Sequence, residues 1–187
     1  SGPAGMVSVG STLYGITSSG GPADTVTGIW YAVGEVFSIN PDGSNFNPAR
    51  VFTNANGAYP RGTHLKVGSA LYGLTEVGGS QNLGVLYKYD LNVGAISVVH
   101  QFTGRDGANP VSSLITVGGK LYGTAELGVS SYGLDGYGRG LIFSVNPDGS
   151  DYQILHEFAG PDGTNPRASL LALGSTLYGV AAFGGTS

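Results

Sequence analysis

The segment GLIFSVNPDGSDYQILHEF, residues 140–158, has the pattern of two strands joined by a tight turn. The runs on both sides are short and rich in apolar, β-branched and aromatic residues, which is typical of strands. Between them, proline presets one backbone angle of a turn, and the Asp-Gly pair that follows tolerates positive φ. The letters NPDGS stand at residues 40–44 and again at 146–150. A hairpin turn that occurs twice predicts a protein built from repeats.

Three anchor positions place these repeats in register. The distance between the two anchor aromatic residues of a repeat is always 15 residues. The distance from the second of them to the leucine of the following LYG triplet is always 19. All variation lies between LYG and the first aromatic, where the distances are 24, 16 and 22 residues. The anchors are the first residue of LYG (Leu13, Leu71, Leu121, Leu177), the end of a Gly-x-x-aromatic phrase (Phe37, Tyr87, Phe143) and a later aromatic (Phe52, Phe102, Phe158).

Each repeat divides into four short strands separated by turn signals. In the third repeat the strands are SLITVG, KLYGTAEL, GLIFSVN and YQILHEF. Repeated four-stranded antiparallel units of this length predict an all-β protein, a β-propeller with one unit per blade. We expect a single domain, residues 1–187, with three full blades near 3–58, 59–109 and 110–165 and a two-stranded half-blade near 166–187.

The phrases LYGxTxxGG, GxxFsxNPDGS and ilHxFxGxDGxNPxaSL resemble the GloVer (Gloeo/Verruco) tandem repeat family over nearly the whole chain. The order of the strands is also similar to kelch repeats. The resemblance implies a bacterial protein that is extracellular or at the cell surface. It implies no particular activity, because a fold hosts many functions.

The composition limits the partners that we expect. Of the 187 residues, 11% are charged and the formal net charge is -4, so a basic surface for nucleic acid is not predicted. No apolar run is long enough for a membrane span, and we expect no membrane insertion. The chain has no cysteine, which excludes disulfides and thiolate metal sites and leaves the redox compartment open. We expect no cofactor.

Twelve strands of three full blades and two of a half-blade do not close a ring within one chain. An open arc would expose a blade face and a strand edge, which proteins seldom leave uncovered. Three explanations remain: a fragment of a longer propeller, two copies that complete a ring, or copies joined end to end. We expect a homo-oligomer, with a twofold dimer preferred.

Loops of variable length on a rigid scaffold are the usual place for binding. The first repeat inserts PADTVTGIWYAV and the third inserts VSSYGLDGYGR between their second and third strands. Aromatic rings beside a few polar groups suit a carbohydrate or protein ligand, although packing of the loops against the blades is the simpler alternative. The candidate binding residues are Trp30, Tyr31, Tyr132, Asp135, Tyr137 and Arg139.

Three ionisable residues are candidates for catalysis. Glu76 and Glu126 occupy the same place in two repeats, and a pair of carboxylates on neighbouring blades is the machinery of glycoside hydrolysis. Inheritance within the repeat explains the same pair without chemistry. His64 stands where other repeats have apolar residues, and we expect it to face the central channel, as solvated lining or as a general base.

Asp106 and Asp162, with Asn109 and Asn165, offer oxygen atoms that suit calcium. Their Asp-Gly context favours a different role, in which the carboxylate accepts a hydrogen bond from the backbone of its own turn.

The function that we expect is a non-catalytic extracytoplasmic propeller module for adhesion, scaffolding or ligand binding. One alternative is a hydrolase or lyase at the channel mouth that uses His64 with Glu76 or Glu126. Another is a structural polymer whose subunits join through the incomplete blade. An enzyme would bring carboxylate or imidazole groups together in one pocket.

Overall fold

The computed structural model describes residues 5–20, 33–128 and 138–185, and all regular elements in these ranges are β-strands. The first sheet contains β1 (Val7–Val9), β2 (Thr12–Thr17), β3 (Glu35–Ile39) and β4 (Asn47–Val51). The second contains β5 (Ala58–Val67), β6 (Ala70–Val77), β7 (Val85–Asp90) and β8 (Ala95–Gln101). The third contains β9 (Ile115–Val117), β10 (Lys120–Ala125), β11 (Leu141–Val145) and β12 (Gln153–Glu157). A C-terminal hairpin follows, with β13 (Leu171–Leu173) and β14 (Thr176–Tyr178).

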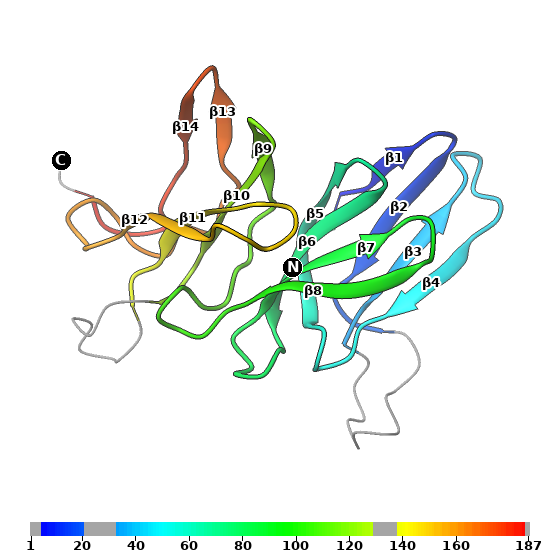
Figure 1. Ribbon diagram of the computed structural model, residues 1–187, viewed down its shortest axis with the longest axis horizontal. Helices are drawn as coiled ribbons and strands as arrows, with labels where there is room; N and C mark the ends of the chain where they lie inside the picture. The colour runs from blue at the N-terminus through cyan, green and yellow to red at the C-terminus, as the bar shows by residue number, and fades with distance from the viewer. Residues whose placement is uncertain (1–4, 21–32, 129–137, 186–187) are drawn as a thin grey trace.

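Every sheet is an antiparallel meander whose strands follow one another in chain order. Figure 1 shows the sheets arranged in sequence, from the first (blue to cyan) through the second (green) to the third (yellow to orange) and the hairpin. The expected repeats of four antiparallel strands are therefore confirmed, and the hairpin supplies the expected pair. The described residues form no closed sheet. Within these ranges no helix has the length and apolar character needed to cross a membrane.

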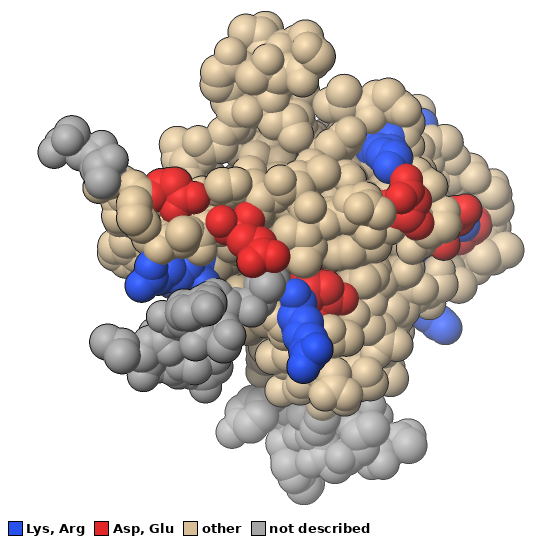
Figure 2. Space-filling view, turned by 60° about the vertical axis from the view of Figure 1, so that its left-hand side comes forward, with Lys and Arg blue, Asp and Glu red and all other residues tan. Residues whose placement is uncertain are grey.

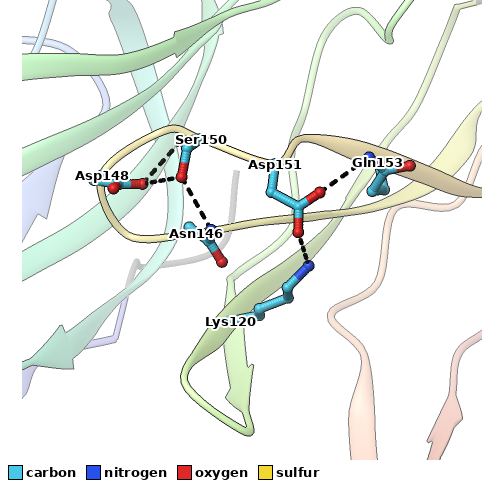
Figure 3. A network of polar contacts seen from close by, with 6 residues as sticks. All are labelled: Lys120, Asn146, Asp148, Ser150, Asp151 and Gln153. Atoms are coloured by element: carbon cyan, nitrogen blue, oxygen red, sulfur yellow. Dashed lines mark hydrogen bonds and ion pairs between the residues drawn. The ribbon is translucent and has the colours of Figure 1, made fainter.

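The NPDGS turn forms the expected hairpin between the third and fourth strands. Asp148 accepts hydrogen bonds at one carboxylate oxygen from the backbone N–H of Ser150 (2.9 Å) and from its hydroxyl (2.6 Å). Asn146 donates from its side-chain amide to the same serine hydroxyl (3.0 Å), as Figure 3 shows. The turn at residues 40–44 repeats these contacts. Local turn chemistry thus fixes where the third strand ends and the fourth begins.

The glycine of LYG and the aromatic residue of the next strand form one cross-strand unit. Gly123 lies directly opposite Phe143, and a Cβ atom at Gly123 would lie 2.7 Å from that ring. The pairs Gly15–Phe37 and Gly73–Tyr87 are arranged in the same way. Glycine is required here because the aromatic ring of the neighbouring strand lies flat over its backbone.

The third anchor aromatic packs each sheet against the next. Phe52 of the first sheet meets Tyr87 of the second edge to face, with ring centroids 4.8 Å apart. Phe102 of the second sheet meets Phe143 of the third at 5.5 Å. All four rings are fully or almost fully buried, and they lie at the centres of the two apolar clusters between the sheets. The constant spacing of the anchors reflects this contact.

A chain of hydrogen bonds links the start of each repeat to the start of the next. The backbone N–H of Gly5 donates to the hydroxyl of Thr63 (3.1 Å), whose own N–H donates to Ser113 (2.8 Å). The N–H of Ser113 then donates to the hydroxyl of Ser169 (2.9 Å). These residues are 58, 50 and 56 positions apart, which are the spacings of the LYG triplets. Consecutive sheets therefore meet through equivalent atoms.

Candidate functional site

The loops that follow the second strands share one end of the sheets with the connections between sheets. The N–H of Gly79 donates to the carbonyl of Asn54 (2.7 Å), and the N–H of Asn109 donates to the carbonyl of Leu83 (2.9 Å). The NPDGS turns lie at the opposite end of the same strands. The sites of both insertions lie at the end that carries the loops after the second strands. We call this end the loop face. The candidates Trp30, Tyr31, Tyr132, Asp135 and Tyr137 lie outside the described residues.

Arg139 is the one binding candidate that the structure describes, and its contacts are internal. Its guanidinium donates to the carbonyl of Ala159, and its own carbonyl accepts a hydrogen bond from the N–H of Asn165 (2.8 Å). Both contacts hold the connection between β12 and β13 against the third sheet. Arg139 therefore supports the loop face.

Glu76 and Glu126 each bind an arginine. Arg61 on β5 donates from Nε to Glu76 (2.7 Å), and Arg167 donates to Glu126 (2.6 Å). The hydrogen bond and charge of Glu126 raise the pKa of Arg167, and the charge of Glu76 raises it further. Each of the two carboxylates thus has its own cation. Sequence reasoning missed Arg167, although Arg61 and Arg167 both directly follow the proline that opens a repeat.

His64 does not line a solvated channel, so that expectation is wrong. Its side chain is buried, with 4% of the residue exposed, and a 2.8 Å hydrogen bond joins its Nε2 to the hydroxyl of Tyr87. Its Nδ1 has no hydrogen-bonding partner. Burial lowers the pKa of His64 to about 4 and raises the pKa of Tyr87. The imidazole is therefore neutral and enclosed, and it is hydrogen-bonded to neither glutamate.

The burial of His64 has a local cause in β5. The pairing of β5 with β6 shifts register between Arg61 and Leu65, and His64 lies in this irregular stretch. A register irregularity re-aims the side chains within it, so strict alternation along the strand does not apply. The sequence contained a signal for the outcome, because Tyr87 stands where the other repeats have Phe37 and Phe143.

Asp106 and Asp162 hold turns, as their Asp-Gly context favoured. One carboxylate oxygen of Asp106 accepts a hydrogen bond from the N–H of Thr103 (2.7 Å), and the other lies 2.9 Å from Nε2 of His100. Asp162 has the same two contacts, with the N–H of Ala159 (2.8 Å) and with His156 (2.7 Å). Among the described residues, no group of three or more His, Cys, Asp or Glu side chains is placed to bind a metal ion.

Charged side chains of both signs are interspersed on the described part of the face shown in Figure 2. On the face shown in Figure 2, basic and acidic residues lie beside one another on a largely uncharged surface. The ion pairs of Arg61 with Glu76 and of Lys120 with Asp151 are examples of this pairing. A surface of this kind gives no long-range attraction for a polyanion.

Two solved structures resemble the chain at low sequence identity. One is a Bombyx mori β-fructofuranosidase of glycoside hydrolase family 32, a mutant in complex with sucrose, with a TM-score of 0.53 and 16% identity. The match covers 93% of this chain and 41% of that one. The tricorn protease matches with a TM-score of 0.40 and 11% identity, over 92% of this chain and 20% of that one. The chain thus spans less than half the length of either protein.

No curated protein matches the chain. A family model described as the Gloeobacter/Verrucomicrobia repeat matches residues 2–187. The match includes the anchors, the NPDGS turns and the contacts between sheets described above. The chain therefore belongs to the Gloeobacter/Verrucomicrobia repeat family.

Proposed function

We propose that the three sheets and the hairpin are successive blades of a β-propeller. Two observations support this architecture. Equivalent aromatic residues pack each sheet face to face against the next, and equivalent hydroxyl groups link the first strands in order. The similarity to the β-fructofuranosidase, with a TM-score of 0.53, supports the same arrangement.

Within this architecture the chain serves as a non-catalytic binding module. The observation that carries the proposal is that each ionisable residue considered for chemistry forms a contact that stabilises the repeat. Glu76 and Glu126 bind arginines, His64 bonds to a buried tyrosine, and Asp106 holds a turn. A hydrolase or lyase built on His64 would need that imidazole at a substrate, and its burial opposes this role.

The loop face is the proposed ligand surface, and a carbohydrate is the proposed ligand. The sequences of the two insertions contain Trp30, Tyr31, Tyr132 and Tyr137, whose ring types suit contact with a sugar, and the polar residue Asp135. We also propose a location outside the cytoplasm, at the cell surface or in the medium, where a carbohydrate-binding surface would meet its ligand.

A carbohydrate-array measurement tests this surface. The full chain is compared with the double variant Trp30→Ala and Tyr31→Ala and with Phe46→Ala. Phe46 is 58% exposed and follows the NPDGS turn at the opposite end of the first sheet, so it is a matched aromatic control. We expect glycan binding that is lost in the double variant and kept in Phe46→Ala. Binding that depends on Phe46, or no binding to any glycan, would contradict the proposal.

We further propose that copies of the chain associate through the two ends of the arc. Met6 is more than half exposed beside the first sheet, and Val180 and Phe183 are more than half exposed beyond the hairpin. Exposed apolar residues at both ends support a contact that buries them. Analytical ultracentrifugation should detect a dimer or larger species, and electron microscopy would distinguish closed particles from filaments. A monomer at all concentrations would refute the proposal.

A further inference from the structure

A cavity of about 210 Å³ lies between the third sheet and the C-terminal hairpin. Phe158 and His156 of the third sheet line one side of it, and Leu170 and Gly179 of the hairpin line the other. Phe158 is only half-buried, whereas its equivalents Phe52 and Phe102 are fully or almost fully buried by the next sheet. The cavity therefore lies where two aromatic rings meet in the other sheet-to-sheet contacts.

Between the second and third sheets, residues of β11 and β12 fill the corresponding space. Phe143 lies over Gly123 and packs against Phe102. Tyr152 stacks on His100, with ring centroids 4.1 Å apart and planes 7° from parallel. The hydroxyl of Tyr152 also donates to the carbonyl of Asp106 (2.6 Å). A third strand and the start of a fourth thus supply two aromatic side chains to one receiving surface.

The surface around the cavity repeats that receiving surface position by position. Six residues around the cavity stand 56 positions after their equivalents between the second and third sheets. The pairs are His100 with His156, Phe102 with Phe158, Asp106 with Asp162, Leu114 with Leu170, Gly123 with Gly179, and Ala125 with Ala181. The surface around the cavity therefore has the residue types of the receiving surface between the second and third sheets. They include the glycine over which one ring lies and the histidine on which a second ring stacks.

A strand edge lies beside this cavity. In the part of the chain that the structure describes, β14 pairs with β13 alone. In each complete sheet the second strand pairs on that side with a third strand. Backbone donors and acceptors on such an edge bind an added strand readily.

We propose that this cavity and the edge of β14 receive the third and fourth strands of a repeat of this family. The occupant is an extended Gly-x-x-aromatic strand, an NPDGS-type turn and a strand with a second aromatic residue. The first aromatic ring lies over Gly179 and against Phe158, and the second stacks on His156. The interface continues the series already formed between the first, second and third sheets.

The pairing of β10 with β11 gives the register of the added strand. Leu121 lies opposite Val145, Gly123 opposite Phe143, and Ala125 opposite Leu141. Transferred to the hairpin, the added strand places its aromatic residue opposite Gly179. Its apolar residues two positions before and after lie opposite Ala181 and Leu177.

A synthetic peptide of residues 138–158 is the probe, because it contains one complete pair of these strands. Fluorescence anisotropy of the labelled peptide with the full chain should give saturable binding with one peptide per chain. A peptide with Phe143→Ala should bind about 30-fold more weakly or worse, since a buried aromatic anchor commonly carries this share of an interface. Equal binding of the two peptides would overturn the proposal.

Two variants of the full chain locate the site. Gly179→Val fills the place of the ring and should abolish binding. Tyr178→Ser is the matched control, because neighbouring residues of a strand point to opposite faces, and it should leave binding unchanged. Hydrogen exchange at β5–β8 verifies that both variants are folded. Binding that survives Gly179→Val, or is lost in Tyr178→Ser with the fold intact, would overturn the proposal.

Self-association is measured in the same samples. A dimer that competes with the peptide and is lost in Gly179→Val supports the proposal, because it uses the same cavity and strand edge. A chain that neither binds the peptide nor associates through Gly179 refutes it. The inference rests on the proposed blade architecture and is independent of the proposed ligand surface. The double variant Trp30→Ala and Tyr31→Ala should bind the peptide normally even if no glycan binds.

Discussion

The buried pair of His64 and Tyr87 can be replaced by the pair that the same chain uses elsewhere. At these two positions the third repeat has Leu114 and Phe143. The double variant His64→Leu and Tyr87→Phe therefore reproduces in the second sheet a contact that already exists in the third. Each single variant removes only one half of the hydrogen bond.

The structure gives the expected magnitudes. Either single variant leaves a buried polar group without a partner, which costs about 1–3 kcal/mol. The double variant removes both polar groups, and its free energy of unfolding should lie close to or above that of the native chain. The coupling free energy between the two positions is then the sum of the two single losses, about 2–6 kcal/mol.

The pH dependence gives a second test. His64 has a pKa of about 4 in the folded chain, against about 6.5 when unfolded. The unfolded chain alone takes up the proton between these values, so stability is full above pH 6.5 and falls as the pH drops toward 4. The loss is about 3 kcal/mol, and below pH 4 it grows no further. His64→Leu abolishes this contribution.

Urea denaturation of the four chains at pH 7.5 and pH 5 measures both effects, with the transition midpoint and the m-value fitted separately. Two results would refute the reasoning. One is additive destabilisation in the double variant. The other is a difference in stability between pH 7.5 and pH 5 that is unchanged in His64→Leu, because the imidazole would then be accessible to protons in the folded chain.

Three further predictions concern the contacts that define the repeat. Gly123→Val should destabilise the chain by about 1–3 kcal/mol, because the new side chain meets the ring of Phe143, while Gly179→Val should cost less, because a Cβ atom there meets only the side chain of Leu170 (2.9 Å); thermal unfolding compares the two. Asp106→Ala should cost about 1–2 kcal/mol, whereas Asp106→Asn should keep most of the stability, since Asn56 accepts the equivalent turn bond in the first repeat; equal losses in urea would contradict this role. Ser113→Ala should lower the free energy of unfolding by about 0.5–1.5 kcal/mol and speed hydrogen exchange at the N–H of Thr63, because this N–H loses its acceptor. Unchanged exchange at Thr63 would refute the prediction.

The repeats and their strands could be predicted from sequence because their determinants are local. The NPDGS turn acts within five residues, and its hydrogen bonds are the ones that its residue types favour. The constant spacing of the anchors gave the register of the sheets. The spacing within one repeat did not show which contact the anchor residues make. That contact, such as Phe102 with Phe143, lies between two sheets.

The site could be predicted less well, because its geometry depends on contacts distant in sequence. His64 is turned inward beside an irregularity in β5 and bonds to a tyrosine 23 residues away. Glu126 is bound by Arg167, 41 residues further along the chain. Neither partner follows from the pattern of one strand. The pair of His64 and Tyr87 could have been identified by comparing the repeats, because both positions hold other residues in the other repeats.

The comparison of repeats also separates structural residues from candidates for function. His64 differs from Leu114 at the equivalent position, and its contact Tyr87 differs together with it. His100 is replaced by Arg50 in the first repeat, and its partner Asp106 is replaced there by Asn56. A residue that changes together with its contact is explained by packing.

The segments between the second and third strands behave differently. Their lengths vary while the residues on both sides, from LYG to the Gly-x-x-aromatic phrase, keep the same contacts in every sheet. Differences in loop length that do not change the contacts between the strands are expected at a ligand-binding surface. We therefore expect that exchanging residues 129–137 for the shorter equivalent loop, residues 79–81, would leave the sheets intact and change only what the loop face binds.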